Sequence, residues 1–346
     1  MAITTKIQAQ VLVTETPELF ELAVARAVDL LRAGQVVALP TETVYGLAAN
    51  ALNPEAVARI YAVKGRPAHN PIIVHVAEEG MARRCVAEWP ALAGRLARAF
   101  WPGPMTLVLK KSEAIPSIVT AGGDTVGVRW PSHPFIQAVI RACGFPLAAP
   151  SANPSNQVSA TNAAHVRKHL GTKVPLIVDG GQSQIGIEST VLDVSVRPPR
   201  VLRPGMIHEQ ALLAVTGELA LQGGERTGLL KSPGQLRKHY SPRARLVVRS
   251  WRDDRELAGQ VAAAGAPERR TCVVAHTRVP SGERFARVSV IPHDAEAFAR
   301  ALYAELHECD ELEPELIVVE APPETIEWRG IRDRLIRAAA PAQPGT

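Results

Sequence analysis

The chain has 346 residues, which suggests about two domains at roughly 150 residues each. Its 46% hydrophobic and 21% charged residues exclude a largely disordered protein. It contains no apolar run of about 18 residues that would span a bilayer, and residues 1–18 lack the apolar core of a secretory signal, so we expect a cytoplasmic protein without a membrane segment. The four cysteines form no Cys-x-x-Cys pair, which predicts reduced thiols rather than a zinc site or disulfides.

Positive charge is concentrated in the first part of the chain. Residues 1–207 carry 20 Lys and Arg against 14 Asp and Glu, whereas residues 208–346 carry 19 against 20. The first part is therefore the expected place for an anionic ligand. Aromatic residues make up only 4% of the chain, which argues against a stacking platform for single-stranded nucleic acid.

Helix and strand signals alternate up to about residue 210. Thr16 and Pro17 predict the start of a helix that ends at Gly34, and a second helix is expected from Pro54 to Gly65. Further helices are expected near 91–100, 133–143 and 162–170, and strands at 36–39, 72–76, 105–109, 126–130, 147–149, 176–178, 190–194 and 200–202. This alternation predicts a mixed α/β domain.

The pattern changes after residue 217. Residues 218–242 are rich in glycine and proline with little periodicity, which is typical of a linker. Beyond them, strands are expected at 244–248, 271–275, 288–291 and 316–320, with helices near 252–264, 294–309 and 330–340. We therefore expect a small α/β domain at 243–346.

Familiar catalytic motifs are absent from the sequence. It has no Gly-Lys-Ser/Thr phosphate loop, no Gly-x-Gly-x-x-Gly after the first strand and no Gly-x-Ser-x-Gly elbow. His165 and His169 have the i, i+4 spacing of zinc ligands, but no Glu follows the first His. We interpret them as surface positions on a helix.

The first informative stretch is PTETVYGLAANA, residues 40–51, which directly follows a hydrophobic strand. It gathers three hydroxyl groups, those of Thr41, Thr43 and Tyr45, in a turn at a strand end, where α/β proteins place ligands. A turn that only satisfies its own backbone is an equally good interpretation of these residues alone.

The second stretch is KGRPAHNPIIVHV, residues 64–76. Lys64 and Arg66 flank a helix-ending glycine and precede a proline, so both cations are expected to leave a rigid corner that suits a polyphosphate. Asn70 adds amide donors, and His75 lies in an apolar strand. A single histidine there is usually a satisfied core residue, but the neighbouring cations favour a functional one.

Two further stretches combine arginine with small hydroxyl residues. One runs from GGDTVGVRW to APSANPSNQVSAT, and the other from GIESTVLDV to RVLRPG. Small polar loops of this kind let backbone amides approach an anion closely. The residues concerned are Arg129, Ser151, Asn153, Ser155, Ser159, Thr161, Ser189, Thr190 and Arg203.

In this order, these motifs resemble the YrdC-like family of threonylcarbamoyl-AMP synthases over residues 15–210. KSPGQLRKHYSP, residues 231–242, is similar to the linker of the longer, two-domain form of that family. The resemblance implies a mixed twisted α/β sheet with helices, the YrdC-like catalytic domain, at residues 1–217. It also implies a linker at 218–242 and a small Rossmann-like C-terminal α/β domain at 243–346.

The resemblance implies an ATP-dependent nucleotidyltransferase that condenses L-threonine, bicarbonate and ATP to threonylcarbamoyl-AMP and pyrophosphate. A downstream tRNA-modifying threonylcarbamoyl transferase complex would then use this product to make threonylcarbamoyladenosine in tRNA. We expect Mg²⁺ to arrive with the triphosphate, because it keeps several waters and needs few protein ligands; no metal-ligand set of the protein itself is assigned.

The family's residue roles fall on matching positions of this sequence. Lys64 and Arg66 are implied as catalytic. The implied threonine contacts are Thr43, His75, Arg129 and Ser189. The implied ATP contacts are Lys64, Arg66, Asn70, Thr125, Ser151, Asn153, Thr161 and Arg203, with Tyr240 reaching in from the linker.

The sequence departs from the family pattern at two loop positions. Asn156 replaces the usual glycine and Ala160 replaces a frequent proline. Because Asn tolerates left-handed backbone, we expect the loop to keep its conformation. Two other functions stay open: a related carbamoyl-transfer enzyme, and an RNA-binding module that uses the basic first part without catalysis.

Overall fold

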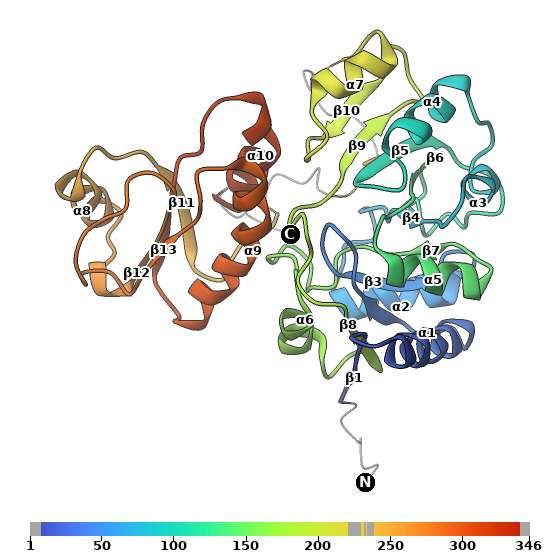
Figure 1. Cartoon of the computed structure of the whole chain (residues 1–346), viewed down its shortest axis with the longest axis horizontal. Helices are drawn as coiled ribbons and strands as arrows, with labels where there is room; N and C mark the ends of the chain where they lie inside the picture. The colour runs from blue at the N-terminus through green and yellow to red at the C-terminus, as the bar shows by residue number, and fades with distance from the viewer. Residues whose placement is uncertain (1–7, 221–229, 232, 234–238, 340–346) are drawn as a thin grey trace. The chain divides into compact units, whose positions relative to one another are not determined.

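The computed structural model describes residues 8–220, 230, 231, 233 and 239–339 (Figure 1). Its backbone contacts divide the chain into two compact units. The first comprises Met1–Ser155, Ser159–Gln184 and Glu188–Gln235, and the second comprises Asn156–Val158, Ile185–Ile187 and Leu236–Thr346. Most of the predicted linker, 218–242, lies outside the described residues. Within the described ranges, no helix is both long and apolar enough to cross a bilayer.

The first unit is built on a ten-stranded sheet in the order β1-β8-β2-β3-β7-β4-β6-β5-β9-β10. The strands are β1 (Gln10–Val13), β2 (Val37–Leu39), β3 (Gly46–Asn50), β4 (Val74–His75), β5 (Met105–Lys110), β6 (Thr125–Arg129), β7 (Leu147–Ala148), β8 (Leu176–Asp179), β9 (Thr190–Asp193) and β10 (Arg200–Arg203). Parallel pairs such as β4 with β6 and β5 with β9 alternate with antiparallel pairs such as β5 with β6. The predicted mixed sheet is confirmed.

Seven helices accompany this sheet in the described part of the first unit: α1 (Pro17–Arg32), α2 (Pro54–Lys64), α3 (Glu79–Arg84), α4 (Ala91–Phe100), α5 (Pro134–Cys143), α6 (Ala163–Leu170) and α7 (Glu209–Thr216). The Thr16 hydroxyl accepts from the Leu19 amide, so it caps α1 as predicted. α1 lies beside α5 (Figure 1), where the rings of Phe20 and Phe135 meet edge to face at 5.2 Å.

Helix α2 ends where the sequence predicted. Gly65 follows its last residue with a φ of 59°, a left-handed conformation that glycine adopts without strain. The chain therefore turns sharply between Lys64 and Arg66. This turn places two cations on either side of one glycine at the edge of the core.

The second unit contains a four-stranded, all-parallel sheet in the order β11-β14-β12-β13. Its strands are β11 (Arg245–Arg249), β12 (Thr271–Ala275), β13 (Arg287–Val290) and β14 (Leu316–Glu320), and its helices are α8 (Asp254–Ala263), α9 (Ala295–Glu311) and α10 (Arg329–Ala339), with short 3₁₀ turns at Glu268–Arg270 and Ile326–Trp328. These elements match the predicted small Rossmann-like domain. The four cysteines of the chain are free thiols, and all are buried.

Four elements of the first unit were not predicted: β1, β3, α3 and α7. β3 has the sequence GLAAN, whose residues have low strand propensity. It forms because its backbone pairs on one side with β2 and on the other with β7. Such pairing lies between distant segments and leaves no mark in local composition.

Candidate active site

The turn of residues 40–45 joins β2 to β3 and is fixed by its own hydroxyl groups. Thr41 Oγ1 donates to the Val44 carbonyl at 2.6 Å and accepts from the Thr43 amide at 3.2 Å. Thr43 Oγ1 lies 3.0 Å from Thr41 Oγ1. Either hydroxyl can be the donor of this contact, and the Thr43 hydroxyl keeps hydrogen-bonding capacity for a ligand. Both side chains are buried.

His75 and Arg129 are neighbours across β4 and β6. They are paired in register, so their side chains lie on the same face of the sheet, which Thr125 shares because it precedes Arg129 by four residues. Burial lowers the pKa of His75 to about 3, with a further contribution from the Arg129 charge. The imidazole is therefore neutral at pH 7. Its buried Nδ1 has no hydrogen-bond partner among the described residues.

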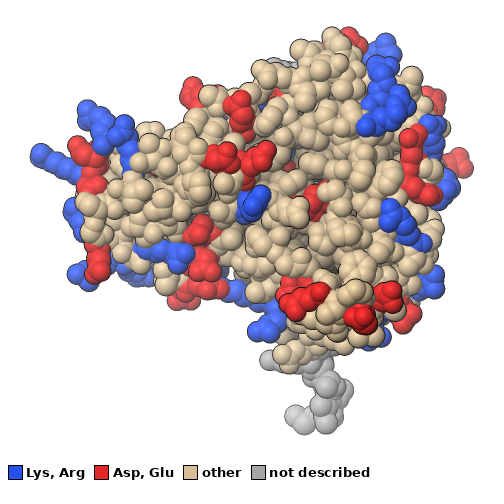
Figure 2. All heavy atoms as spheres, viewed as in Figure 1, with Lys and Arg blue, Asp and Glu red and all other residues tan. Residues whose placement is uncertain are grey.

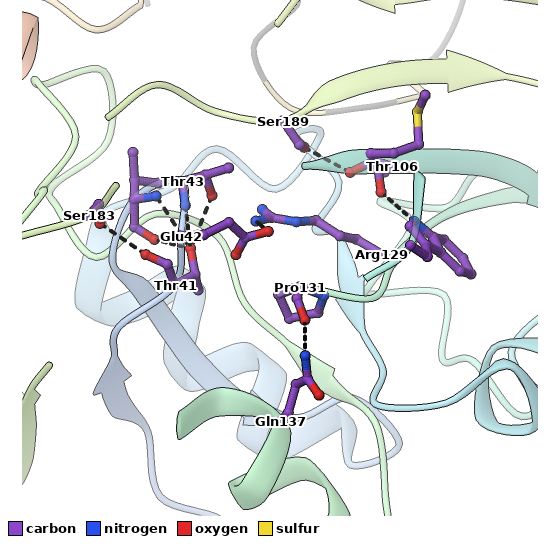
Figure 3. Close-up of polar contacts among 12 residues, drawn as sticks. Thr41, Glu42, Thr43, Thr106, Arg129, Pro131, Gln137, Ser183 and Ser189 are labelled. Carbon is purple, nitrogen blue, oxygen red and sulfur yellow. Dashed lines mark hydrogen bonds and ion pairs between the residues drawn. The ribbon is translucent and has the colours of Figure 1, made fainter. Parts of the chain in front are cut away.

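Glu42 is a site residue that the sequence analysis did not select. Its carboxylate lies 2.7 Å from Arg129 Nη2, and both side chains are at least 95% buried (Figure 3). The hydroxyl groups on either side of Glu42 are the conspicuous feature of this turn in the sequence, and the carboxylate lies between them. An acidic residue three positions after a buried strand was the available signal.

Lys64 connects the end of α2 to residues 151–153, Ser-Ala-Asn, here called the SAN loop. Its Nζ donates to the carbonyl oxygens of Ser151 and Asn153, at 2.5 Å each. The side chain is buried, which holds the Lys64 pKa well below its ordinary value; the Arg66 charge lowers it further and Glu188 raises it. The structure therefore brings together three of the predicted ATP residues.

Arg66 and Asn70 form a second group. The Arg66 guanidinium donates to the Asn70 carbonyl and side-chain oxygens at 2.9 and 2.8 Å, and to the Pro71 carbonyl at 2.6 Å. Asn70 is fully buried, and its Nδ2 has no hydrogen-bond partner in the described part of the chain. That amide donor is available to a bound ligand.

Lys64 and Arg66 were expected to leave a rigid corner, and the structure adds that both are buried. Lys64 is 3% and Arg66 8% exposed. Their hydrogen bonds to loop carbonyls take them out of solvent. Replacing either one is therefore expected to affect stability as well as chemistry, because buried carbonyl groups would lose their donors.

Ser189 and Arg203 are in direct contact. Arg203 Nη2 donates to Ser189 Oγ and its Nε to the Ser189 carbonyl, both at 3.0 Å. Thr106 on β5, which the sequence analysis did not select, completes this group with its Oγ1 at 2.8 Å from Ser189 Oγ (Figure 3). A predicted threonine contact and a predicted ATP contact are thus joined by two hydrogen bonds.

Thr161 lies at the start of α6, where His165 Nδ1 is 3.3 Å from both its amide nitrogen and its hydroxyl. His165 was expected on the surface, but it is only 9% exposed because it turns back onto this loop. Nearby, Ser159 donates to Glu188 at 2.6 Å, and the charge of Glu188 in turn raises the pKa of Lys64. Asn156 has a φ of 66°, so the expected left-handed conformation is confirmed.

Tyr240 belongs to the second unit. There it is 1% exposed, and its ring stacks on Tyr303 with a centroid distance of 6.0 Å. The Arg334 guanidinium lies 5.2 Å from the Tyr240 ring centroid. The remaining predicted site residues all lie in the first unit.

The first unit therefore buries four cations together with neutral donors. Lys64, Arg66, Arg129 and Arg203 are each less than 9% exposed. The structure groups the predicted residues as Lys64 with Ser151 and Asn153, Arg66 with Asn70, His75 with Arg129, and Ser189 with Arg203. Burying this much positive charge is costly unless anions are bound, so the arrangement suits a polyanionic ligand.

Comparison with known proteins gives matches along nearly the whole chain. A family model described as telomere recombination matches residues 29–205, and one described as the C-terminal domain of threonylcarbamoyl-AMP synthase matches residues 206–340. A threonylcarbamoyl-AMP synthase of Bacillus subtilis is 39% identical over 327 residues, covering 91% of this chain and 92% of the relative. One from Pyrococcus abyssi is 45% identical over 225 residues, covering 64% of this chain and 66% of the relative.

The fold also matches solved structures. The crystal structure of P. abyssi Sua5 complexed with L-threonine superposes with a TM-score of 0.86 at 36% identity, covering 95% of this chain and 96% of that one. A P. abyssi Sua5 variant gives the same TM-score and identity, with 96% of both chains covered.

Proposed function

The chain belongs to the two-domain, Sua5-type threonylcarbamoyl-AMP synthases, and on that premise we propose how its own residues carry out the reaction. The activity is nucleotidyl transfer: threonylcarbamoyl-AMP is made for the threonylcarbamoyladenosine modification of tRNA. The overall conversion takes L-threonine, bicarbonate and ATP to threonylcarbamoyl-AMP, pyrophosphate and water. The observation that carries the proposal is the set of four buried cations in the first unit.

The reaction first joins the threonine nitrogen to bicarbonate carbon, giving an N-carboxylate. An oxygen of this carboxylate then attacks the α-phosphorus of ATP, and the bond to the β-phosphate oxygen breaks as pyrophosphate leaves. Negative charges converge in both steps. Lys64, Arg66 and Arg203 would offset their repulsion, and most of the acceleration would come from positioning and charge stabilisation.

Threonine would bind over β4 and β6. Arg129 would hold its carboxylate, the neutral His75 and Ser189 would offer hydrogen bonds, and Thr43 would contribute its hydroxyl group. L-threonine is bound by the P. abyssi Sua5 relative, which supports this assignment.

ATP would bind between the α2 corner and the SAN loop. The remaining ATP contacts are proposed as Asn70, Thr125, Ser151, Asn153 and Thr161, with Tyr240 from the linker. Lys64, held by its hydrogen bonds to the Ser151 and Asn153 carbonyls, would stabilise the negative charge of the phosphates. Two contacts of described linker residues support a role of the linker at the ATP site. Arg203 Nη1 donates to the Pro233 carbonyl at 3.4 Å, and Lys231 pairs with Asp193 at 3.0 Å.

Mg²⁺ is part of the proposal as a companion of the triphosphate, whose charge it would neutralise. The buried Ser155 Oγ, which has no hydrogen-bond partner among the described residues, is an oxygen of the kind that Mg²⁺ takes directly or through a water. Ser155 is adjacent to Lys64, since its amide donates to the Lys64 carbonyl at 2.9 Å.

The proposed partners are the small-molecule substrates and a downstream threonylcarbamoyl transferase complex that carries the product to tRNA in the cytoplasm. Weak RNA binding by the first unit is an alternative explanation of its excess positive charge. On the face drawn in Figure 2, and for the residues described, Lys and Arg are interspersed with Asp and Glu. This arrangement favours small anions over an extended nucleic acid backbone.

The test is pyrophosphate release from ATP with threonine and bicarbonate varied independently. Release that depends on both substrates would support the proposed reaction. Release without threonine would contradict it. An RNA affinity that falls steeply with salt, combined with no threonine-dependent release, would instead favour an RNA-binding module.

A further inference from the structure

Glu42 and Arg129 form a buried ion pair at the proposed threonine site. The carboxylate oxygen lies 2.7 Å from Nη2, and the two side chains are 4% and 5% exposed. Figure 3 shows Glu42 extending from the turn after β2 and Arg129 from the end of β6, with their charged ends facing each other. Their orientation is nevertheless poor for hydrogen bonding. Both Glu42 oxygens and Arg129 Nε and Nη2 lack an aligned hydrogen bond within the described residues.

This arrangement is costly for the free protein. Two charges have been taken out of water, and their attraction repays that cost only where further hydrogen bonds complete them. Buried polar groups in native proteins are nearly always hydrogen-bonded, so each exception calls for an explanation. Here two donors and two acceptors are left side by side, which is the hydrogen-bonding capacity that a bound ligand would fill.

Within the described residues, the ion pair that Glu42 makes is with Arg129. His133 lies close enough for Glu42 to affect its pKa, but burial has the larger effect and lowers that pKa, so His133 is uncharged at pH 7. Arg129 is therefore the cation that balances Glu42 in the free protein. A ligand that takes up the Arg129 charge with its own carboxylate would need to offer Glu42 a positive group in return.

Only one of the three substrates can do so. ATP and bicarbonate are anions, and a buried carboxylate repels both. Threonine is a zwitterion whose ammonium group lies one carbon away from its carboxylate. If threonine binds beside Arg129 and Glu42, its carboxylate pairs with the guanidinium and its ammonium group pairs with the Glu42 oxygens. All four charges are then paired.

We propose that Glu42 binds the α-ammonium group of the amino-acid substrate and, with Arg129, selects a zwitterion. The inference rests on the proposed role of Arg129 at the threonine carboxylate. It assigns Glu42 to holding the nitrogen that later bonds to bicarbonate carbon. In that step the ammonium and bicarbonate give an N-carboxylate, one water and one proton, so the nitrogen must first be fixed where bicarbonate can reach it.

The experiment compares two ligands that differ only in the amine. Binding of L-threonine and of (R)-3-hydroxybutanoate, which is threonine without its amino group, is measured by calorimetry on the full chain without ATP. In Glu42→Gln the affinity for threonine should fall roughly 10–100-fold, the range expected for one charge-assisted hydrogen bond. The affinity for the deaminated ligand should stay the same or rise. An unchanged ratio of the two affinities overturns the role of Glu42.

Two further variants keep the result interpretable. Glu42→Asp retains the charge but draws it back by one methylene group; it should weaken threonine binding and spare the deaminated ligand, and equal losses for both would overturn the inference. Glu188→Gln makes the same change at another buried carboxylate, which accepts from Ser159, and should leave the ratio unchanged. A wild-type protein that binds neither ligand would overturn the proposed threonine site as well.

Discussion

Lys64 has a structural and a chemical role in the same side chain. Its ammonium group is buried and donates to two backbone carbonyls of the SAN loop. It thereby holds the loop that carries two other proposed ATP residues. It also keeps a positive charge near Arg66, an arrangement that is unfavourable in the free protein and favourable once phosphates are bound.

Replacing Lys64 should therefore lower both activity and stability. In Lys64→Ala we expect threonine-dependent pyrophosphate release to fall at least ~100-fold, as for other groups that stabilise transition-state charge. The free energy of unfolding should fall by about 1–3 kcal/mol, because the Ser151 and Asn153 carbonyls lose their donor. Denaturant titration and the release assay measure the two effects. The matched control is Lys173→Ala at an exposed position, which should change stability by less than ~0.5 kcal/mol.

His75 should make the protein sensitive to acid. Its pKa is about 3 in the folded protein and 6.5 ordinarily, so between these values the unfolded chain binds a proton that the folded chain does not. The free energy of unfolding should therefore keep its full value above pH 6.5. It should decrease as the pH falls, by about 2 kcal/mol between pH 6.5 and 5. In His75→Gln this share of the pH dependence should disappear.

Equilibrium unfolding at several pH values checks this expectation. The matched control is His69→Gln at an exposed position, which should keep the acid sensitivity that depends on His75. If the free energy of unfolding fell equally in the wild type and in His75→Gln down to pH 5, the buried His75 would not be the source of the acid sensitivity.

At the scale of elements, β5, β9 and β10 meet at Ser189. The Ser189 hydroxyl precedes β9, accepts from Arg203 at the end of β10 and lies 2.8 Å from Thr106 on β5. Because Arg203 can only donate, a proton from Thr106 would leave the Ser189 proton free for a ligand. Thr106 is thus a positioning residue for Ser189.

Removing the Thr106 hydroxyl should weaken threonine binding. In Thr106→Val we expect KM for threonine to rise about 2–10-fold, which corresponds to one neutral hydrogen bond, with little change in kcat. Thr106→Ser keeps the hydroxyl and should restore KM. Steady-state kinetics with threonine varied at saturating ATP and bicarbonate measure the effect, and equal KM values for the Val and Ser variants would contradict it.

The elements themselves were largely predictable, because their ends are marked locally. Asn53 accepts from two amides at the start of α2, and Gly65 terminates it, as the sequence indicated. The strand β3 was not predictable from GLAAN, since pairing with β2 and β7 outweighs its weak propensity. Local signals identify helix ends, whereas strand pairing depends on distant segments.

The same distinction applies to the site. Lys64, Arg66 and Arg129 could be selected because a cation at a rigid corner or in a buried strand is conspicuous in a sequence. Glu42 and Thr106 could not be selected in this way, because their roles depend on distant partners. Arg129 is 87 positions from Glu42 and Ser189 is 83 positions from Thr106, and only the fold brings them close. The burial of Lys64 and Arg66 likewise depends on carbonyl acceptors that no side-chain pattern records.

At the scale of the whole molecule, the chain comprises two compact units, and the predicted linker lies between them in the sequence. Lys231 pairs with Asp193 and the Pro233 carbonyl accepts from Arg203, so described residues of the linker contact strands of the first unit. An N-carboxylate and an adenylate both hydrolyse readily, and excluding water protects them. Tyr240 is proposed to help exclude water from these intermediates.

Removing only the Tyr240 hydroxyl tests that role without disturbing the packing of the second unit. Tyr240→Phe keeps the ring on Tyr303 and beneath the Arg334 guanidinium, so the aromatic packing of the second unit should be retained. If the hydroxyl binds ATP, KM for ATP should rise about 3-fold or more, and the yield of threonylcarbamoyl-AMP per pyrophosphate should fall as intermediates escape to water. Chromatographic quantitation of AMP and threonylcarbamoyl-AMP measures this yield. Tyr303→Phe makes the same change on the stacking partner and should keep the wild-type yield; an identical loss in both variants would assign the effect to the second unit in general rather than to Tyr240.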